Sequence, residues 1–277
     1  MKYDIKIAII GHGFVGKAVD YGFTHPSIEK YIVDPIYGTT IDDLPICNYY
    51  FVCVPTPFGS DGKINTSILD SVMEKLGSSL HGIIIIKSTV TPDVITKWHN
   101  HIVYNPEFLT EKSANEQFVN PEFHIFGGFE VYTNEVERLY KEFSLCSPCP
   151  ALHMSLEEAS FVKYTINSFL AMKVLFFNQL YDAIGDTNAN FGTIIKAVGC
   201  DGRIGPSHTK VPGFDGRQGY GGACFPKDTS AFVNYSKRLT LLEKCIEINN
   251  TYRTRYELDE REKAQNVIYN GQTKKEF

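Results

Sequence analysis

The sequence lacks the long apolar run that a membrane-spanning helix or a secretory signal requires. Its first residues, MKYDIKIAIIGHG, hold an apolar run of strand length followed by glycines. They contain neither a signal-peptide core with a cleavage site nor a span of about 18 apolar residues. The sequence therefore predicts a soluble, cytoplasmic protein that does not associate with a membrane.

Clusters of lysine and arginine are also missing. The 277 residues carry 27 Lys and Arg against 32 Asp and Glu, for a formal net charge of -5. Because clustered cations hold nucleic acid backbones, this composition argues against nucleic acid as a partner, although local positive groups can still meet an anionic small molecule. The sequence also has no internal repeat, and its length predicts one large or two medium globular domains.

The cysteines do not form a recognisable disulfide framework. Their number, seven, is odd, and they are scattered along the chain. Cys146 and Cys149 form one CxxC motif, but no second CxxC or nearby histidine pair completes a zinc site. We therefore predict no metal.

A dinucleotide-binding signature opens the chain. Residues 5–10, IKIAII, read as a strand and lead at once into GHGFVG and a helix-compatible segment. In such a motif Gly11 makes the tight turn, Gly13 lets a pyrophosphate approach the backbone, and Gly16 lets helix and strand pack closely. A second strand ends in Asp34, whose carboxylate would bind the adenosine ribose and repel a 2′-phosphate, which favours NAD over NADP. The predicted contacts here are Gly11, Gly13, Phe14, Val15, Gly16 and Asp34.

Further strands end in polar loops. A strand over residues 48–54 is stopped by prolines, and a buried strand over residues 82–87 leads into Ser88 and Thr89. Ligands of doubly wound folds bind at this carboxyl edge, although Thr89 could equally cap the next helix. The predicted cofactor contacts here are Val54, Pro55, Thr56, Ser88 and Thr89. The alternation of strands and helices predicts a Rossmann-type, mostly parallel α/β sheet over residues 1–150.

The second part, residues 151–277, is predicted to be helical. From Ser155, with a capping acid at Glu158, about thirty residues read as one helix that is apolar almost all round. Such a helix is buried between domains or against a second copy, so we expect a homodimer through residues 155–184. Lys163 and Asn167 share a face of it, and their burial needs a polar partner unless the lysine reaches solvent at the rim. Further helices are predicted over residues 187–199, 227–237 and 241–267.

A glycine-rich segment, GYGGACFPKD, places a cysteine ahead of a helix. Pro226 fits the first helical position, so Cys224 precedes the helix N-terminus and stands near Lys227. Both the helix dipole and the ammonium favour a thiolate, which is a nucleophile. The alternative is a turn followed by a buried, inert cysteine.

Acids and cations occur in two other loops. Glu107 and Glu111 lie in one segment, NPEFLTE, where different surroundings could give them the separate pKa values that acid–base chemistry needs, although Glu111 could simply be a solvated acid. The loop over residues 201–219 carries Arg203, Lys210 and Arg217, which could meet an anionic substrate.

Seven motifs in order resemble one family. Over nearly the whole chain, the sequence resembles the UDP-glucose and GDP-mannose dehydrogenases. The matching motifs are, in order, GHGFVG, VPTP, KSTV, NPEFLTE, the helix with Lys163 and Asn167, RIG and GYGGACFPKD. The resemblance implies NAD-dependent, four-electron oxidation of the C6 alcohol of a nucleotide sugar to the uronate, with UDP-glucose to UDP-glucuronate as the expected conversion.

The resemblance also implies a role for each matching residue. Cys224 would add to the aldehyde to give a thiohemiacetal and then a thioester, with Lys163 and Asn167 holding the oxygen. The other implied catalytic residues, which assist or orient the hydrolytic water, are Glu107, Asp228 and Thr89. Glu111 and Lys227 match positions near the cofactor. Arg203 resembles an arginine that reaches the neighbouring subunit's substrate. The implied substrate contacts are Glu107, Phe108, Leu109, Lys163, Asn167, Arg203, Lys210, Arg217, Tyr220 and Gly221.

The sequence departs from the family pattern in two respects. Typical members continue into a second nucleotide-binding domain, which this chain is expected to lack as a short form. The loop before Cys224 is longer than in many relatives, and we hypothesise that Lys210 and Arg217 replace part of the lost diphosphate contact. Two alternatives remain: a two-electron β-hydroxyacid-type dehydrogenase, which has no use for Cys224, and a non-catalytic NAD-binding protein derived from the enzyme.

Overall fold

The computed structural model describes residues 5–77, 82–98 and 101–269. Contacts divide the chain into two compact units. The N-terminal unit comprises residues 1–56 and 65–163, and the C-terminal unit comprises residues 57–64 and 164–277. The predicted domain boundary at residue 150 stays a prediction.

A seven-stranded sheet forms the centre of the N-terminal unit. Its strand order is β2-β1-β3-β4-β5-β6-β7, and every neighbouring pair is parallel except β5 with β6. The mostly parallel sheet is as predicted. The strands are β1 (Ile5–Ile10), β2 (Ile28–Val33), β3 (Tyr49–Val52), β4 (Ile83–Ile86), β5 (Ile102–Tyr104), β6 (His124–Gly128) and β7 (Ala151–Met154).

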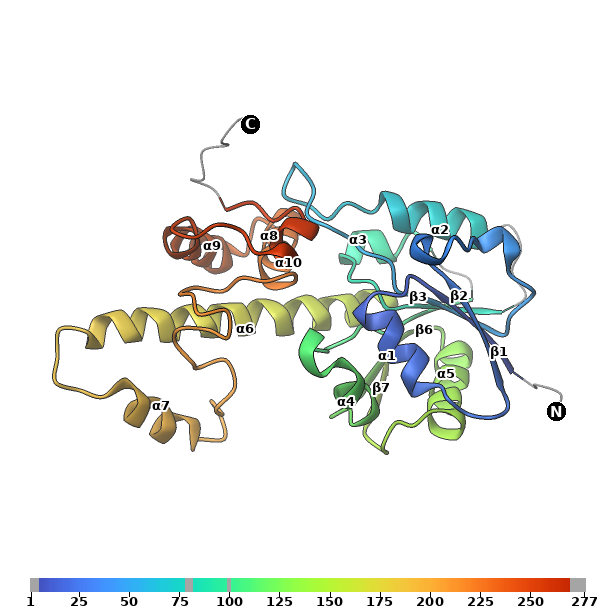
Figure 1. Ribbon diagram of the computed structural model, residues 1–277, viewed down its shortest axis with the longest axis horizontal. Coiled ribbons are helices and arrows are strands. Elements are labelled where there is room, and N and C mark those ends of the chain that lie inside the picture. The colour runs from blue at the N-terminus through green and yellow to red at the C-terminus, as the bar shows by residue number, and fades with distance from the viewer. Residues whose placement is uncertain (1–4, 78–81, 99–100, 270–277) are drawn as a thin grey trace. The chain divides into compact units, whose positions relative to one another are not determined.

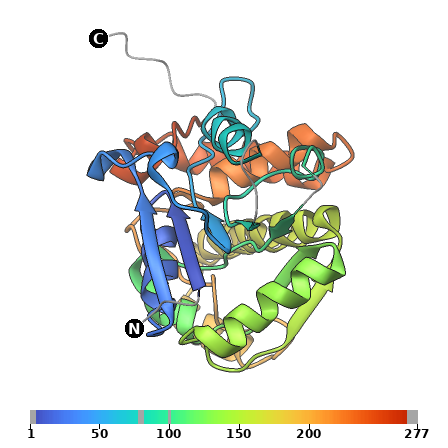
Figure 2. The same ribbon diagram turned by 90° about the vertical axis from the view of Figure 1, so that its right-hand side faces the viewer.

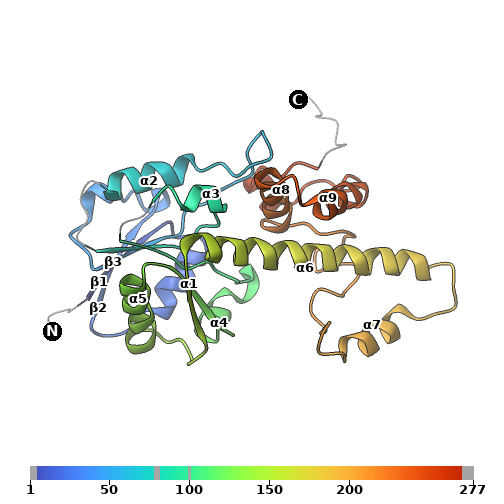
Figure 3. The ribbon, with the colours of Figure 1, turned by 180° about the vertical axis from the view of Figure 1, so that it is seen from behind.

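Helices cover both faces of this sheet. Figures 1 and 3 show α2 (Ser67–Gly77) and α3 (Pro92–Ile95) on one face, with α1 (Phe14–Gly22), α4 (Ala114–Val119) and α5 (Glu130–Phe143) on the other. Because both faces are covered, β3 and β4 contain no charged residue, and all four residues of each strand are buried. The face with α1 packs around Phe23, Phe51 and Phe126, each fully buried.

The strand order places one crossover point at the carboxyl edge of the sheet. β1 pairs with β2 on one side and with β3 on the other, so the chain leaves β1 and β3 in opposite directions across the sheet. The loops after these two strands therefore diverge at a topological switch point, where open α/β sheets bind ligands.

Strand β7 was not predicted from the sequence. This strand extends the sheet beyond β6, and Figure 2 shows it beside α5. Its residues ALHM are too few and too mixed in polarity for a clear pattern, and two of them are exposed. Cys146 and Cys149 lie in the loop between α5 and β7, and both are free thiols.

The C-terminal unit is helical. The long helix α6 (Leu156–Ile184) belongs to it from Tyr164 onward, and α7 (Phe191–Gly199), α8 (Phe225–Tyr235), α9 (Thr240–Arg253) and α10 (Glu260–Ala264) follow. The predicted start of α6 is confirmed, because Ser155 and Glu158 exchange hydrogen bonds in a capping box. None of the described helices is both long and apolar enough to cross a membrane.

One prediction for this unit was wrong. The expected helix over residues 241–267 is two helices, because α9 ends at Arg253 and α10 starts only at Glu260. Asp259 caps the new start through the N–H of Glu262, an interaction that favours a helix beginning there over one running through.

A short segment from early in the sequence completes the C-terminal unit. Residues 57–64 form a loop closed by the bridge between Phe58 and Ile64. The carbonyl of Gly62 accepts hydrogen bonds from Ser230 Oγ at 2.9 Å and Asn234 Nδ2 at 3.1 Å. This unit is therefore assembled from two separate stretches of chain.

Candidate active site

The glycine turn after β1 has the shape of a dinucleotide cradle. Gly11 has a φ of +88°, and a Cβ there would meet the Cys53 carbonyl oxygen at 2.8 Å, so only glycine fits. A Cβ on Gly16 would meet the Gly11 oxygen at 2.0 Å, whereas a Cβ on Gly13 would meet nothing within 4 Å. The turn is thus closely packed on its protein side and open at Gly13, where a pyrophosphate would lie at the N-terminus of α1.

Asp34 is fixed at the end of β2 beside this turn. Its Oδ2 accepts the His12 N–H at 2.7 Å and its Oδ1 accepts the Ile36 N–H at 2.9 Å. Burial alone would raise the pKa of Asp34, but these two hydrogen bonds lower it below the usual value. A carboxylate held in this way is an anionic acceptor for ribose hydroxyls and a poor neighbour for a 2′-phosphate.

The loops after β3 and β4 are tied together at the same edge. Thr56 Oγ1 donates to the Thr89 carbonyl at 2.8 Å, and Ser88 Oγ donates to the Val54 carbonyl at 2.6 Å. Pro55 is exposed between them, and Phe14 and Val15 begin α1. The structure thus collects most of the predicted cofactor residues around one switch point, whereas Glu111 begins a short 3₁₀ helix and is exposed.

The contrast between Gly13 and Gly16 leads to a test of the cradle. We expect Gly13→Ala to leave the melting temperature unchanged but to weaken NAD binding at least about tenfold, because its methyl would occupy the open face. Gly16→Ala should instead lower the melting temperature, because its methyl overlaps the Gly11 backbone. Calorimetry of both variants, with and without NAD, distinguishes the two effects. Equal affinity in Gly13→Ala and the unchanged protein would place the cofactor elsewhere.

Lys163 and Glu107 form a buried pair in the N-terminal unit. Lys163 Nζ donates to the Glu107 carbonyl at 2.5 Å and lies 3.4 Å from Glu107 Oε1, with both residues under 10% exposed. Glu107 Oε2 accepts the Leu109 N–H at 2.6 Å, and the Phe108 ring lies 5.1 Å from the ammonium. The alternative in which Lys163 reaches solvent is wrong, because the carboxylate and carbonyl of Glu107 hold it inside.

A second buried lysine in this unit was not singled out by the sequence. Lys87 is 5% exposed, and its Nζ donates to Asn105 Oδ1 at 2.8 Å. Burial lowers the pKa of Lys87 to about 8, against smaller opposing effects of Cys53 and Glu107. The signal in the sequence is a lysine that ends an otherwise apolar strand.

The lowered pKa of Lys87 predicts how stability depends on pH. Between about pH 8 and 10.5 the unfolded chain binds more protons than the folded chain, so the unfolding free energy rises with pH in this window. Between these two pH values, the unfolding free energy of the unchanged protein should rise by on the order of 3 kcal/mol relative to that of Lys87→Met. Urea unfolding followed by fluorescence of the single tryptophan, Trp98, measures the difference. The exposed-site variant Lys97→Met should show no such gain, and a flat difference for Lys87→Met would contradict the prediction.

Cys224 lies at the start of α8 in the C-terminal unit, as predicted. It is the N-cap residue and is half-buried, with a proline in the first two helical positions. One turn later Asp228 is 1% exposed, and its N–H donates to the Cys224 carbonyl at 2.9 Å. Cys224 therefore lies at the end of the helix whose free N–H groups favour an anion.

Two further side chains hold Asp228. Asn167 Nδ2 donates to Asp228 Oδ2 at 2.6 Å, and Lys227 Nζ donates to Oδ1 at 2.5 Å. All three groups are buried. Asn167 lies one turn after Lys163 on α6. The same helix therefore carries the amide that binds Asp228 and the ammonium that binds Glu107.

The predicted substrate residues in the loop before Cys224 differ in their surroundings. Tyr220 is 3% exposed and Gly221 follows it, whereas Arg203 is exposed and pairs with Asp201 at 2.6 Å. Lys210 Nζ lies 5.0 Å from the Phe214 ring centre. Arg217 lies 3.5 Å from Glu262 Oε2 and 5.6 Å from the Tyr256 ring centre, with only 23% of its side chain exposed. The three cations thus have different partners.

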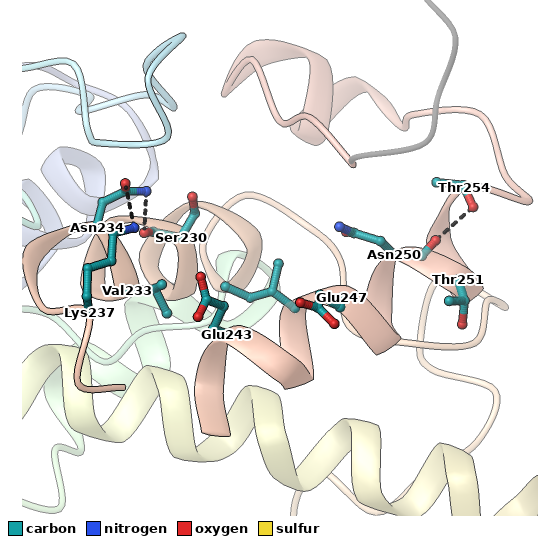
Figure 4. A pocket seen from close by; sticks show the side chains of 10 residues that line it. Ser230, Val233, Asn234, Lys237, Glu243, Glu247, Asn250, Thr251 and Thr254 are labelled. Atoms are coloured by element: carbon teal, nitrogen blue, oxygen red, sulfur yellow. Dashed lines mark hydrogen bonds between the residues drawn. The ribbon is translucent and has the colours of Figure 1, made fainter. Parts of the chain in front are cut away.

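A cavity of about 490 Å³ lies between α8 and α9 (Figure 4). Its walls carry Ser230, Asn234, Lys237, Glu243 and Asn250, and none of the predicted site residues lines it. We place the candidate site at Cys224 and not in this cavity, because the cavity is lined by none of the residues that the sequence motifs singled out. Across residues 5–77, 82–98 and 101–269, no group of three metal-binding side chains is arranged to hold an ion.

Two family profiles match this chain. The NAD binding domain of the UDP-glucose/GDP-mannose dehydrogenase family matches residues 37–144, and the central domain of the same family matches residues 157–251. The prediction of NAD as the cofactor is confirmed by the first match.

Relatives that carry enzyme names show the same similarity. A UDP-glucose 6-dehydrogenase of Rhizobium meliloti is 30% identical over 89% of this chain and 68% of its own length. The UDP-glucose 6-dehydrogenase TuaD of Bacillus subtilis is 29% identical over 82% of this chain and 52% of its own length. This chain spans about half the length of several such relatives, and 26% of an uncharacterized Methanocaldococcus jannaschii protein that is 31% identical.

Solved structures share the fold. A UDP-glucose dehydrogenase of Pyrobaculum islandicum superposes with a TM-score of 0.75 at 23% identity, over 89% of this chain and 68% of that one. A UDP-D-ManNAc dehydrogenase of Pyrococcus horikoshii gives a TM-score of 0.74 at 20% identity, over 88% and 68%. The predicted fold class, a Rossmann-type sheet followed by a helical part, is confirmed.

Proposed function

Because the chain belongs to the UDP-glucose/GDP-mannose dehydrogenase family, we propose that it oxidises the C6 alcohol of a nucleotide sugar to the carboxylate with NAD, using Cys224 as the nucleophile. One observation carries the proposal. Cys224 caps α8 directly before a buried cluster of Asn167, Lys227 and Asp228. Burying these polar groups costs free energy, and an inert buried cysteine beside them would not explain why the protein keeps them there.

The glycine turn supports NAD as the electron acceptor. The open face at Gly13, the close packing at Gly16 and the carboxylate of Asp34 fit a pyrophosphate and an adenosine ribose. NAD bound there would accept a hydride from the sugar carbon in each of two oxidations. The side chains of this chain supply the remaining chemistry.

In the first oxidation the C6 hydroxyl would pass its proton to water at the site and C6 would pass a hydride to the bound NAD, leaving an aldehyde. We assign Lys163 and Asn167 to the sugar oxygen, because an ammonium and an amide donor stabilise negative charge that develops there. Each well-placed donor of this kind contributes about 3 kcal/mol to lowering the barrier.

In the second stage the Cys224 thiolate forms a bond to the aldehyde carbon and gives a thiohemiacetal. Loss of the second hydride leaves a thioester on Cys224, and one water then cleaves the carbon–sulfur bond, releasing the carboxylate and restoring the thiol. We assign Glu107 as the acid–base group for this water, with Asp228 and Thr89 orienting it. A covalent intermediate keeps the reactive aldehyde from leaving or hydrating.

UDP-glucose, giving UDP-glucuronate, is the substrate we propose. The named activities of the Rhizobium meliloti and Bacillus subtilis relatives support it. The decisive experiment counts NADH formed per sugar consumed, with UDP-glucose, UDP-N-acetylated sugars and GDP-mannose offered in turn. Two NADH from UDP-glucose alone supports the proposal. One NADH per sugar would select the two-electron alternative, and no turnover with any donor would select the non-catalytic one.

The diphosphate of the substrate is assigned to Lys210 and Arg217. Replacing both with alanine should raise the KM for UDP-glucose about tenfold or more and change kcat little, because the contact is with a part of the substrate that does not react. Lys196→Ala on α7, an exposed lysine outside this loop, is the matched control. An unchanged KM in the double variant would remove this assignment.

A homodimer through α6 is also proposed. Phe169 and Phe176, two turns apart on this helix, are 62% and 61% exposed, which is unusual for large aromatic side chains and supports a covering partner. Arg203 is assigned to the partner's substrate on the family resemblance. Sedimentation of Phe169→Glu should then show monomers, and a persisting dimer would contradict this interface.

A further inference from the structure

The glycine-rich segment before Cys224 is held by side chains from three helices. Asn178 Oδ1 on α6 accepts the Gly219 N–H at 2.9 Å, and Glu262 Oε1 on α10 accepts the Gly222 N–H at 3.2 Å. Asn249 on α9 binds Tyr220 twice, accepting its N–H at 2.7 Å and donating to its carbonyl at 3.0 Å. Backbone groups of Gly219, Tyr220 and Gly222 therefore have side-chain partners, and the last of these residues is two positions before Cys224.

The glycines of this segment are required by its closeness to those partners. A Cβ on Gly221 would lie 2.2 Å from an Arg253 guanidinium nitrogen and 2.6 Å from Glu262 Oε1. A Cβ on Gly219, where φ is +75°, would lie 2.7 Å from Asn249 Oδ1. The glycines that suggested contact with a ligand are thus also explained by contact with α9 and α10.

Glu262 is the centre of this arrangement. It is fully buried, and its Oε1 accepts hydrogen bonds from Arg253 Nη2 at 2.6 Å and from the Tyr269 hydroxyl at 2.8 Å in addition to the Gly222 N–H. Its Oε2 accepts the Asp259 N–H at 2.9 Å, which completes the capping box of α10. Arg253, 1% exposed, also donates to Asp215 Oδ2 at 2.7 Å. A carboxylate with this many donors has one position and one orientation.

We propose that Glu262, fixed by Arg253 and by the capping box of α10, is a positioning residue that holds residues 219–222 and thereby places the Cys224 sulfur at the N-terminus of α8. The contact joins residues 40 positions apart in sequence. The inference rests on the proposed function for its effect on turnover, but its effect on the segment and on the thiol does not depend on any substrate.

The test compares Glu262→Gln with the unchanged protein. The variant keeps the size of the side chain and removes the charge that neutralises Arg253, so the hold on Gly222 should loosen. We expect hydrogen exchange in a peptide covering residues 219–223 to be at least about tenfold faster. The pH midpoint for alkylation of Cys224 by iodoacetamide should move upward, because a thiolate that leaves the helix N-terminus loses the stabilising free N–H groups.

Two further variants make the result specific. Glu247→Gln makes the same change at an exposed glutamate of α9 that pairs with Lys244, and it should alter neither measurement. Tyr269→Phe removes one donor to Glu262 without altering charge, so it should give smaller changes in the same direction, and it decides the matter if Glu262→Gln does not fold.

The inference is overturned if a folded Glu262→Gln variant shows the same hydrogen exchange and the same alkylation midpoint as the unchanged protein. If Glu262→Gln does not fold, the same two results in Tyr269→Phe overturn it. Under the proposed function, kcat with UDP-glucose should fall at least about tenfold in Glu262→Gln. If the unchanged protein oxidises no nucleotide sugar, the proposed function is wrong. The exchange and alkylation measurements still test the role of Glu262, because neither depends on a substrate.

Discussion

Cys224→Ala is expected to abolish conversion of UDP-glucose to the carboxylate, with a fall of at least about a thousandfold. Without the sulfur, an aldehyde at C6 has no covalent acceptor, and its oxidation must wait for a free hydrated form. Any remaining NADH should come from the first oxidation only, so the yield should fall from two per sugar to at most one. Stopped-flow absorbance of NADH, combined with chromatography of the sugar product, measures both quantities.

Cys245→Ala provides a matched control for this experiment. Cys245 is a half-buried free cysteine on α9 in the same unit, and no role is assigned to it. Its replacement should preserve the two-to-one yield and most of kcat. Full activity in Cys224→Ala would contradict the covalent mechanism, and a yield of one NADH per sugar in both proteins would then select the two-electron alternative.

Asp228→Asn is expected to have the next largest effect. Asp228 is the common acceptor of Asn167 and Lys227, and all three groups are buried. An amide at residue 228 presents a donor where one of these partners already donates, and it leaves the Lys227 ammonium without its counter-charge. Breaking a buried pair in this way costs about 3–5 kcal/mol of stability. We also expect kcat to fall about a hundredfold or more, because the donor on Asn167 moves.

The control for Asp228→Asn separates stability from catalysis. Leu242→Ala removes buried apolar volume from α9, which should cost about 2–5 kcal/mol and lower the melting temperature similarly without touching the polar cluster. Below its melting temperature Leu242→Ala should keep kcat. If both variants lose activity in proportion to their melting temperatures, the role of Asp228 is structural and the assignment to water or oxygen positioning is wrong.

Local signals in the sequence predicted much of the fold. The apolar run before GHGFVG, the stop at Pro55 and the capping box at Ser155 each act within a few residues, so the strands and the start of α6 could be read directly. β7 could not, because its place in the sheet depends on pairing with β6, and its four residues carry too little pattern. The break between α9 and α10 was missed, although Asp259 and Glu262 have the spacing of a capping box.

The candidate site shows the same limit. Motif spacing placed Cys224 ahead of a helix, and the structure agrees, because helix starts are local. The sequence did not predict which partner each buried polar group would bind. Lys163 meets Glu107 across 56 positions and Asn167 meets Asp228 across 61, and such pairings depend on the tertiary fold. Lys87 and Arg253 went unnoticed for the same reason, since a lysine or an arginine in a sequence looks exposed until its neighbours are known.

The loop over residues 57–64 has a consequence for how this protein is made. Its Gly62 carbonyl is the acceptor for Ser230, which is synthesised 168 residues later. During translation, residues 57–64 therefore cannot form this hydrogen bond until α8 has left the ribosome. A gene fragment that starts at codon 164 would lack the loop altogether, so subcloning the helical half should yield a poorly soluble product, whereas supplying the loop through a short fused linker should restore it.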